Sequence, residues 1–292
     1  DDFVFRDIDL LPDEALEDLG KIMRLSMAWT ALPSSAYLTS MSLLGKPKGG
    51  SRTVAILPSF YRLMMRTNGT VIQQWDDEHA LVFDTAVKNS SALQAALKRS
   101  WIMEMARKEK HYAVQMLWDM EKFFDSVQLG PLFDQLNTHG YQSELLVIGA
   151  MQHRAPRVLR VGATLSDIIP AFGCSILAGC QQSVSFVRGL MLSFVHSLGY
   201  KLTIQPSACY QHVDDLAQCV VDPCRRRVVK AAFEIGVKVL QWDRKLKLNI
   251  SPKSKIVGGA AAEQVARLLT QAGLPVQAAE CADDLGVTAN GC

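Results

Sequence analysis

Three aspartates have the positions in the sequence that most directly suggest a catalytic or metal-binding role. Asp214 and Asp215 stand side by side in the segment Tyr210–Leu216, and Asp119 follows the apolar run Val114–Trp118. Adjacent like charges repel, and apolar surroundings disfavour the charged form, so this composition suits a purely structural turn poorly. Two carboxylates on a tight turn and a third from another strand suit hard divalent cations such as Mg²⁺. Two such ions about 4 Å apart clamp the attacking and leaving oxygens in phosphoryl transfer.

A second chemically informative segment is basic and rich in glycine. Between Met41 and Arg66 the chain has basic residues and no acidic one, and its turn at 45–52 combines glycines with Lys48 and Arg52. Glycines let the backbone approach a triphosphate, and arginine offers a planar fork of donors to its oxygens. The spacing is not the Gly-x-x-x-x-Gly-Lys-Ser/Thr of a Walker P-loop. The segment is a candidate phosphate-binding loop, with a solvated hairpin tip as the alternative.

The carboxylate segments resemble motifs A and C in the palm of reverse transcriptases, especially those of non-LTR retrotransposons. Motif A of that family often reads Asp-x-Glu-Lys-x-Phe-Asp, as Asp119–Asp125 does. Motif C reads aromatic-x-Asp-Asp, and His212–Asp215 matches it with histidine in the aromatic place. The basic turn, followed by Leu57–Pro58 and Tyr61–Leu63, resembles the fingers segment of the same family. The resemblance extends over roughly residues 40 to 290.

The resemblance implies a metal-dependent site. Asp119 would bind two Mg²⁺ ions with the Met120 carbonyl nearby. Asp214 is the stronger candidate of the motif C pair, and Asp215 would assist it or hold the hairpin. Mn²⁺ is a possible substitute for Mg²⁺. For the histidine of motif C, packing beneath a primer end is favoured over metal ligation.

The resemblance also implies nucleotide contacts. Arg52 and Lys48 would hold the incoming nucleotide, although Thr53 departs from the family's usual proline. Phe124 occupies the position of an aromatic sugar gate, where a ring under the ribose leaves no room for a 2′-hydroxyl. This predicts selection of dNTPs, with ordinary core packing as the alternative for Phe124.

Motif B is where the chain departs most from the family, which usually has Gln-Gly. Here Gly179 matches the flexible glycine that lets template or nucleotide approach the backbone, but Ala178 replaces the glutamine. Gln181 or Gln182 is a candidate substitute for the missing side chain.

Motif D of the family resembles the segment 246–255. Lys253, with Lys255 as the alternate, would donate a proton to the leaving pyrophosphate, unless this is simply a basic loop. Leu285–Val287 resembles the start of the primer-grip region that follows.

Composition sets broad limits. The chain has 292 residues, 49% of them apolar, enough for one large domain or two modest ones, and its net charge of +2 does not itself indicate nucleic-acid binding. Arginine clusters at 154–160 and 225–227 suit phosphates, or form solvated faces. All seven cysteines follow residue 170 without a Cys-x-x-Cys pair, which favours reduced thiols in an intracellular protein over a zinc site. The uncharged stretch 168–187 contains proline and glycine, so we expect a buried segment and no membrane association.

Apolar periodicity and turn residues predict a mixture of helices and antiparallel strands, an α+β class. Helices are predicted over 13–30, 58–65, 90–110, 132–136, 143–151, 181–198, 226–240 and 261–272. Strands are predicted over 37–44, 53–57, 114–118, 157–161, 163–165, 202–213, 216–220 and 246–250, and near 285–287.

The resemblance implies a right-hand polymerase whose antiparallel palm sheet is backed by helices. Residues 1–110 would form an N-terminal helix and fingers, and 111–292 the palm, with a fingers insertion at about 130–170. We expect the thumb to be absent or incomplete. Because the chain starts without methionine, we also expect further domains of a longer polyprotein.

The expected function is RNA-templated DNA synthesis by a reverse transcriptase of a non-LTR element. Its partners would be an RNA template, a DNA primer and dNTPs, and family resemblance implies a nuclear location. A decayed or co-opted polymerase that only binds nucleic acid is the alternative, motivated by Ala178, His212 and Thr53. A reverse transcriptase of another lineage, such as a group II intron maturase, also remains open. Phe124 disfavours an RNA-dependent RNA polymerase.

Overall fold

The computed structural model describes residues 5–46, 49–81, 84–170, 173–199, 208–285 and 287–290. The chain forms two compact units, each built from segments that are distant in sequence. The first unit comprises Asp1–Asp76 and Val127–Leu190, and the second comprises Asp77–Ser126 and Met191–Cys292. Lys48 and Gly286, both singled out from the sequence, lie outside the described residues.

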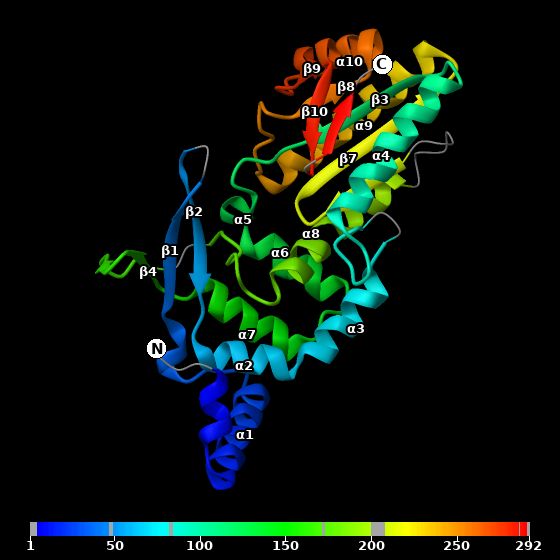
Figure 1. The fold of residues 1–292 in the computed structure, drawn as a ribbon. Helices are drawn as coiled ribbons and strands as arrows, with labels where there is room; N and C mark the ends of the chain where they lie inside the picture. The colour runs from blue at the N-terminus through cyan, green and yellow to red at the C-terminus, as the bar shows by residue number, and fades with distance from the viewer. Residues whose placement is uncertain are drawn as a thin grey trace. The chain divides into compact units, whose positions relative to one another are not determined.

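The first unit combines a small sheet with helices (Figure 1). Its elements are η1 (Phe5–Leu10), α1 (Asp13–Ala28), η2 (Ser34–Tyr37), β1 (Thr39–Gly45), β2 (Ser51–Ile56), α2 (Ser59–Thr67), most of α3 (Gly69–His79), α6 (Leu129–Thr138), α7 (Ser143–Arg154), β4 (Arg157–Val161), β5 (Thr164–Leu165) and the first part of α8 (Ser183–Gly199).

The sheet of the first unit has the order β2-β1-β4-β5. Strands β1 and β2 form the predicted antiparallel hairpin, in which Gly45 pairs with Ser51. Gly49 and Gly50 have φ of 90° and 81°, a conformation that glycine adopts without a steric penalty. The glycines of this turn are therefore required by its backbone geometry, whatever the tip binds.

The second unit is a sheet covered by helices. Its elements are the last part of α3, α4 (Ala92–Lys108), β3 (Tyr112–Trp118), α5 (Phe123–Ser126), the last part of α8, β6 (Ala208–His212), β7 (Asp215–Asp222), α9 (Arg225–Leu246), β8 (Lys255–Val257), α10 (Gly259–Gln271), β9 (Gln277–Ala279), β10 (Cys281–Asp284) and β11 (Val287–Asn290).

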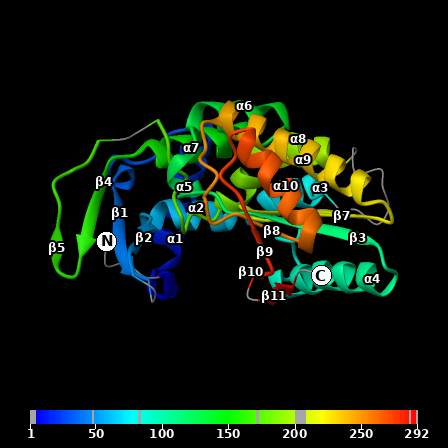
Figure 2. The same cartoon turned by 90° about the horizontal axis from the view of Figure 1, so that it is seen from above.

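Helices cover both faces of this sheet, whose strand order is β6-β7-β3-β8-β9. All neighbouring strands are antiparallel except β8 and β9, which are parallel. Figure 2 shows α9 and α10 above the sheet, with α4 and the β10–β11 hairpin below it. Because both faces are covered, β7 is buried along its whole length after Asp215, and β3 reads as an apolar run.

The structure differs from the sequence predictions in several elements, and β8, β9 and β10 were not predicted. Helix α3 was not predicted, because its apolar positions are interrupted by polar residues. The segment 246–250 was predicted to be extended, but α9 continues through Leu246 and ends at Lys247 in the left-handed conformation, with φ of 55°. Leu285 was predicted to lie in a strand, but it is in the turn between β10 and β11, with φ of 48°.

The predicted domain boundaries and the missing thumb remain predictions. In the described ranges, no helix is both long enough and apolar enough to cross a membrane.

Candidate active site

The acidic residues of the second unit meet at one end of its sheet. Trp118 at the end of β3 pairs with Leu216 near the start of β7. In an antiparallel pair the next residues outward are neighbours, so Asp119 leaves β3 beside Asp215. Asp214 lies in the two-residue turn between β6 and β7, where His212 pairs with Asp215. The fold thus gathers the three aspartates that the sequence singled out.

The turn that carries Asp214 has an unfavourable backbone. Val213 has φ of 57°, which is rare for a β-branched residue. Positive φ at the first central residue of a two-residue hairpin is the pattern of a II′ turn, which usually has glycine there. The side-chain amide of Gln211 donates to the Val213 carbonyl over 3.0 Å. Thr85 contacts both the Gln211 carbonyl (2.9 Å) and Nδ1 of His212 (3.2 Å), so neighbouring side chains hold the strained turn.

The backbone of Asp119 is fixed by two buried serines. The Asp119 amide donates to the Ser254 hydroxyl over 3.0 Å, and that hydroxyl lies 3.2 Å from the Asp119 carbonyl, to which it donates. The amide of Ser251 donates to the same carbonyl over 2.7 Å. Next in the chain, Met120 forms an isolated bridge with Ile250. The two backbone hydrogen bonds of that bridge are made by Asp119 and Glu121, the residues on either side of Met120. Neither bond uses the Met120 carbonyl.

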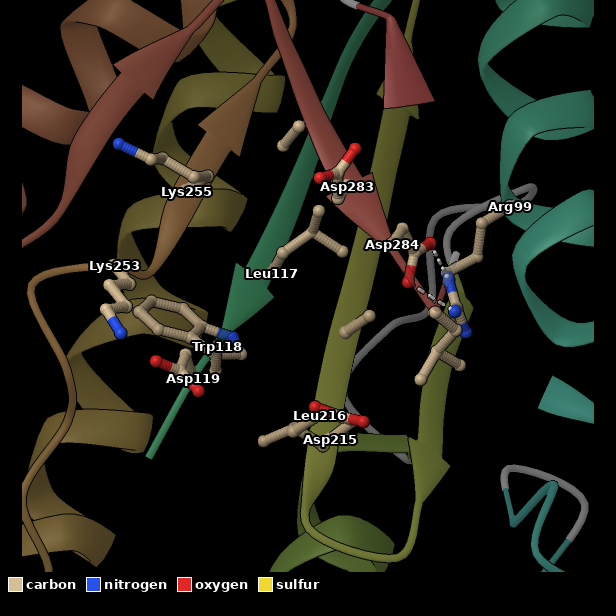
Figure 3. Close-up of a pocket in the computed structure, with 13 residues that line it drawn as sticks. Arg99, Leu117, Trp118, Asp119, Asp215, Leu216, Lys253, Lys255, Asp283 and Asp284 are labelled. Carbon is tan, nitrogen blue, oxygen red and sulfur yellow. Dashed lines mark hydrogen bonds and ion pairs between the residues drawn. The ribbon is translucent and has the colours of Figure 1, made fainter. Parts of the chain in front are cut away.

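A pocket of about 520 Å³ opens beside these residues (Figure 3). Asp119, Asp215 and Lys253 line it together, whereas Asp214 is not among its lining residues. Lys253 reaches it from the loop that holds Asp119, since the Lys253 amide donates to the Ser251 hydroxyl over 3.1 Å. The predicted proton donor and two of the three predicted acidic ligands therefore share one cavity.

The electrostatics of this end of the sheet disfavour negative charge. Burial, followed by the charges of Asp214 and Asp119, raises the pKa of Asp215 to about 6. The charge of Asp284 also contributes to this rise, and the charge of Arg99 opposes it. The pKa of Asp214 is also raised, first by burial and then by the charge of Asp119. Clustered carboxylates of this kind favour a nearby cation.

The donor set fits Mg²⁺, although it is not a preformed cage. Among the described residues, no three His, Cys, Asp or Glu side chains already form a group that could hold a metal ion. Mg²⁺ is commonly held by one or two carboxylates and completed by water and substrate phosphates, so it does not need such a cage. The hard oxygen donors and their mutual repulsion suit a divalent cation that arrives with a phosphate substrate.

Phe124 lies close in sequence to the acidic end of the sheet. It is half-buried on the short helix α5, and its ring meets that of Phe123 edge to face at 5.9 Å. Phe123 is the buried member of the pair, with 2% of its surface exposed. Phe124 is therefore partly accessible, unlike a side chain fully enclosed in the core.

Arg52 and Gly179 belong to the first unit. Arg52 is exposed on β2 and pairs with Leu44. Gly179 has φ of 106°, and a Cβ there would lie 3.0 Å from the Ala55 carbonyl oxygen. The Ala55 amide donates to the Ala178 carbonyl over 2.9 Å. The Gly179 loop thus packs against the strand of Arg52, and this close approach is a structural reason for the glycine.

The suggestion that Gln182 replaces the missing motif B glutamine is wrong. Gln182 is fully buried, and its side-chain oxygen accepts from Tyr61 Oη over 2.8 Å. Its amide nitrogen donates to Tyr141 Oη (3.1 Å) and to the Leu145 carbonyl (3.2 Å). These bonds commit the side chain to the core. Gln181 is exposed, so only this neighbour is accessible for such a contact.

Arg99 and Asp284 are two residues of the pocket that were not singled out from the sequence. Their side chains form an ion pair on its wall (Figure 3). Arg99 looks like any other cation of a charged helix, so nothing local marks it as buried. Asp284 carried a usable signal, because Asp283 and Asp284 are adjacent acids like the motif C pair.

Comparison with known proteins identifies the fold. No family model matches the chain, and no curated protein matches it. Among solved structures, it is similar to apo telomerase from Candida tropicalis truncated from its C-terminal domain. The TM-score is 0.58 at 12% identity, and the match covers 89% of this chain and 54% of that one.

A second similar structure is telomerase from Candida albicans in complex with a fragment of telomeric RNA. The TM-score is 0.55 at 11% identity, over 93% of this chain and 48% of that one. The chain thus spans about half the length of these neighbours. At this identity the likeness establishes the fold alone. It confirms the predicted α+β right-hand polymerase fold with a largely antiparallel sheet backed by helices.

Proposed function

We propose that this chain is a reverse transcriptase of non-LTR retrotransposon type, which synthesises DNA on an RNA template by two-metal nucleotidyl transfer. The observation that carries the proposal is the meeting of Asp119 with Asp214 and Asp215 at one sheet end of a right-hand polymerase fold. A structural turn has no need of three mutually repelling carboxylates beside a pocket that also holds a lysine.

The carboxylates are proposed as the metal ligands. Asp119, Asp214 and Asp215, with the Met120 carbonyl, would hold two Mg²⁺ or Mn²⁺ ions. When bound, these ions activate the primer 3′-hydroxyl and neutralise charge on the leaving pyrophosphate. The serine bonds to the Asp119 backbone fix where its carboxylate is presented.

The remaining residues are proposed to bind and orient the substrates. Lys253 donates a proton to the pyrophosphate as it leaves. Phe124 packs beneath the ribose and excludes a 2′-hydroxyl, while Arg52 and Lys48 hold the triphosphate. Gly179 allows template or nucleotide to approach the backbone.

The proposed partners are an RNA template, a DNA primer and dNTPs, in a longer polyprotein with a nuclear location. One of the similar structures is a telomerase bound to RNA, which supports a template of this kind. The other partners and the location rest on the family resemblance of the motifs.

A second candidate function is a polymerase fold that only binds nucleic acid. Ala178 cannot make the contact of the usual glutamine, and Gln182 is held in the core by Tyr61, Tyr141 and Leu145. A polymerase that had lost this contact and retained template binding would fit these observations.

Primer extension on an RNA template separates the two functions. The purified chain is given a labelled DNA primer, Mg²⁺ or Mn²⁺, and either dNTPs or rNTPs, beside Asp214→Asn. The exposed Asp134→Asn on α6 is the matched control. We expect extension with dNTPs only, lost in Asp214→Asn and kept in the control. Template binding without extension under any condition would favour the second function, and normal extension by Asp214→Asn would overturn the metal-site assignment.

A further inference from the structure

A second pocket of the second unit, here called the α9–α10 groove, lies between helices α9 and α10. Its volume is about 600 Å³. Among the described residues, it shares none with the lining of the pocket beside Asp119 and Asp215. Its walls combine three cations of α9 with apolar side chains and a glutamine: Arg225, Arg226, Val229, Lys230, Phe233, Gln264 and Leu268. The groove is therefore both basic and apolar.

The groove is remote from the acidic end of the sheet. Strand β7 begins at Asp215 and ends at Asp222, and α9 begins at Arg225. The 8 residues of β7 span about 25 Å, so the cations of the groove follow the far end of the strand from Asp215. Figure 2 shows α9 and α10 on the face of the sheet opposite the β10–β11 hairpin. A ligand in the groove would therefore not occupy the candidate active site.

The packing of the two helices explains the apolar floor of the groove. The helices approach closely at Gly236, where an added Cβ would lie 2.6 Å from Leu269 Cδ2. Val229 and Phe233 lie about one to two turns nearer the start of α9. Phe233 and Leu268 are only half-buried there. The floor thus contains apolar side chains that the described chain does not fully cover.

The cations of the groove have donors to spare. Arg225 Nη2 donates to the Ala260 carbonyl over 2.9 Å, which fixes one guanidinium across the start of α10. Across the described ranges, Arg226 forms no hydrogen bond or ion pair. Lys230 has a carboxylate partner in Glu234, whose Oε1 is 4.0 Å from its Nζ. A guanidinium has five N–H donors, so most of the donors at this site are available to an anion.

The positive charge of the groove is short and bounded by acids. Arg227 is paired with Asp222 over 2.8 Å and points away from the lining set. Glu234 on α9 and Glu263 on α10, next to Gln264, are exposed. A nucleic-acid backbone carries a charge at every nucleotide and favours a longer basic track. One or two carboxylates match this charge better, and the apolar floor suits a side chain better than a phosphate.

We propose that the α9–α10 groove is a docking site for a segment of a partner protein in which one or two acidic residues flank an apolar side chain. The apolar side chain packs against Phe233 and Leu268, and the carboxylates pair with Arg226 and Lys230. In the part of the chain that the structure describes, Gln264 makes no hydrogen bond, so its amide is available to the peptide backbone. This inference uses none of the residues of the proposed function and does not depend on it.

Peptide display tests the chemistry of the occupant. A phage library of short random peptides is panned on the purified chain, and phage that bind Arg226→Glu/Lys230→Glu are removed in each round. Both positions are exposed, so this variant is expected to melt like the wild type. We expect the enriched peptides to place Asp or Glu within a few positions of a large apolar residue. Failure to enrich any peptide, or enrichment of peptides without acidic residues, would overturn the proposal.

Fluorescence anisotropy with the most enriched peptide measures each contribution. Arg226→Glu/Lys230→Glu should weaken binding by about thirtyfold or more, because charge-assisted contacts become repulsive. Leu268→Gln should weaken it by about tenfold, the cost of one lost apolar contact. Lys98→Glu/Lys108→Glu, at exposed positions of α4, makes the same change in net charge and should leave the affinity unchanged. An equal loss in this control would mean that net charge alone governs binding, and the site would be refuted.

An oligonucleotide distinguishes this site from a nucleic-acid surface. A fluorescent oligouridylate should bind the wild type and Arg226→Glu/Lys230→Glu with the same affinity. A loss as large as that measured for the peptide would assign the groove to nucleic acid instead. Primer extension should also be unchanged in the double variant. Because peptide binding can be measured whether or not the chain extends a primer, failure of the proposed function would leave this test intact.

Discussion

The buried cluster around Gln182 and the acidic end of the second unit's sheet satisfy their polar groups in different ways. Around the Gly179 loop the buried groups are neutral and bonded to one another, as with Gln182, Tyr61 and Tyr141. At the acidic end of the other sheet, exposed or partly exposed carboxylates gather, the pKa of Asp215 rises to about 6, and Val213 has positive φ. The polar groups of the first arrangement already bond to one another, whereas the repulsion among the carboxylates of the second would be relieved by the cation proposed above. Function is therefore expected where charge and backbone strain are concentrated.

The largest expected effect is at the acidic turn. Asp214→Asn should reduce primer extension by about a thousandfold or more, because the proposed metal ligand is lost. Its melting temperature should stay the same or rise, since a disfavoured charge has been removed. Extension assays and thermal melts on the same preparations check both. A large fall in melting temperature would mean that Asp214 is structural.

The opposite pattern is expected in the first unit. Gln182→Leu should destabilise the protein by about 2–4 kcal/mol, because the hydroxyls of Tyr61 and Tyr141 each lose a buried partner. Urea denaturation measures the change. Gln181→Leu, at the exposed neighbouring position, is the matched control and should be neutral. Equal effects from the two substitutions would contradict the contrast between the units.

The raised pKa of Asp215 predicts how stability depends on pH without metal. Burial, Asp214, Asp119 and Asp284 raise the pKa of this carboxyl from its ordinary value of 3.8 to about 6, against the opposing charge of Arg99. A raised folded-state pKa stabilises the protein fully below the unfolded value, and this contribution is lost as pH rises through about 6. Unfolding free energy should thus fall between about pH 4 and 7, less steeply in Asp215→Asn.

Asp243→Asn is the control for this measurement of stability against pH. Burial also raises the pKa of Asp243 to about 6, so it contributes a slope of the same sign. Added Mg²⁺ should oppose the Asp215 slope, because a ligating carboxylate must be deprotonated. If the unfolding free energy of Asp215→Asn depended on pH as steeply as that of the wild type, the pKa of Asp215 would not be raised by folding.

The smallest effect is expected from the strained turn itself. Val213→Gly relieves positive φ, but glycine gains entropy in the unfolded chain, so the net stabilisation should be under about 1 kcal/mol. Extension should fall modestly as the turn loosens. Urea midpoints and extension rates measure the two quantities. Marked destabilisation would mean that the packing of the Val213 side chain contributes more to stability than its positive φ costs.

The sequence predicts those turns and strands whose conformation depends on residues that are close in sequence. Three features could be predicted from the sequence: the hairpin with its turn at 45–52, the strand that ends before Asp119, and the turn at Asp214–Asp215. Gln181 and Gln182 could not be told apart, because only tertiary packing decides which of two adjacent glutamines faces the core. Arg99 was missed for the same reason, since its partner Asp284 is 185 residues away.

The serine bonds to Asp119 have a mechanical consequence. The Ser254 hydroxyl and the Ser251 amide both bond to the backbone of Asp119. These bonds attach the loop that contains Lys253 to the end of β3. A displacement of that loop necessarily carries the carboxylate with it. Ser254→Ala should therefore reduce activity as the loss of the proposed proton donor Lys253 would, although the serine itself transfers no proton.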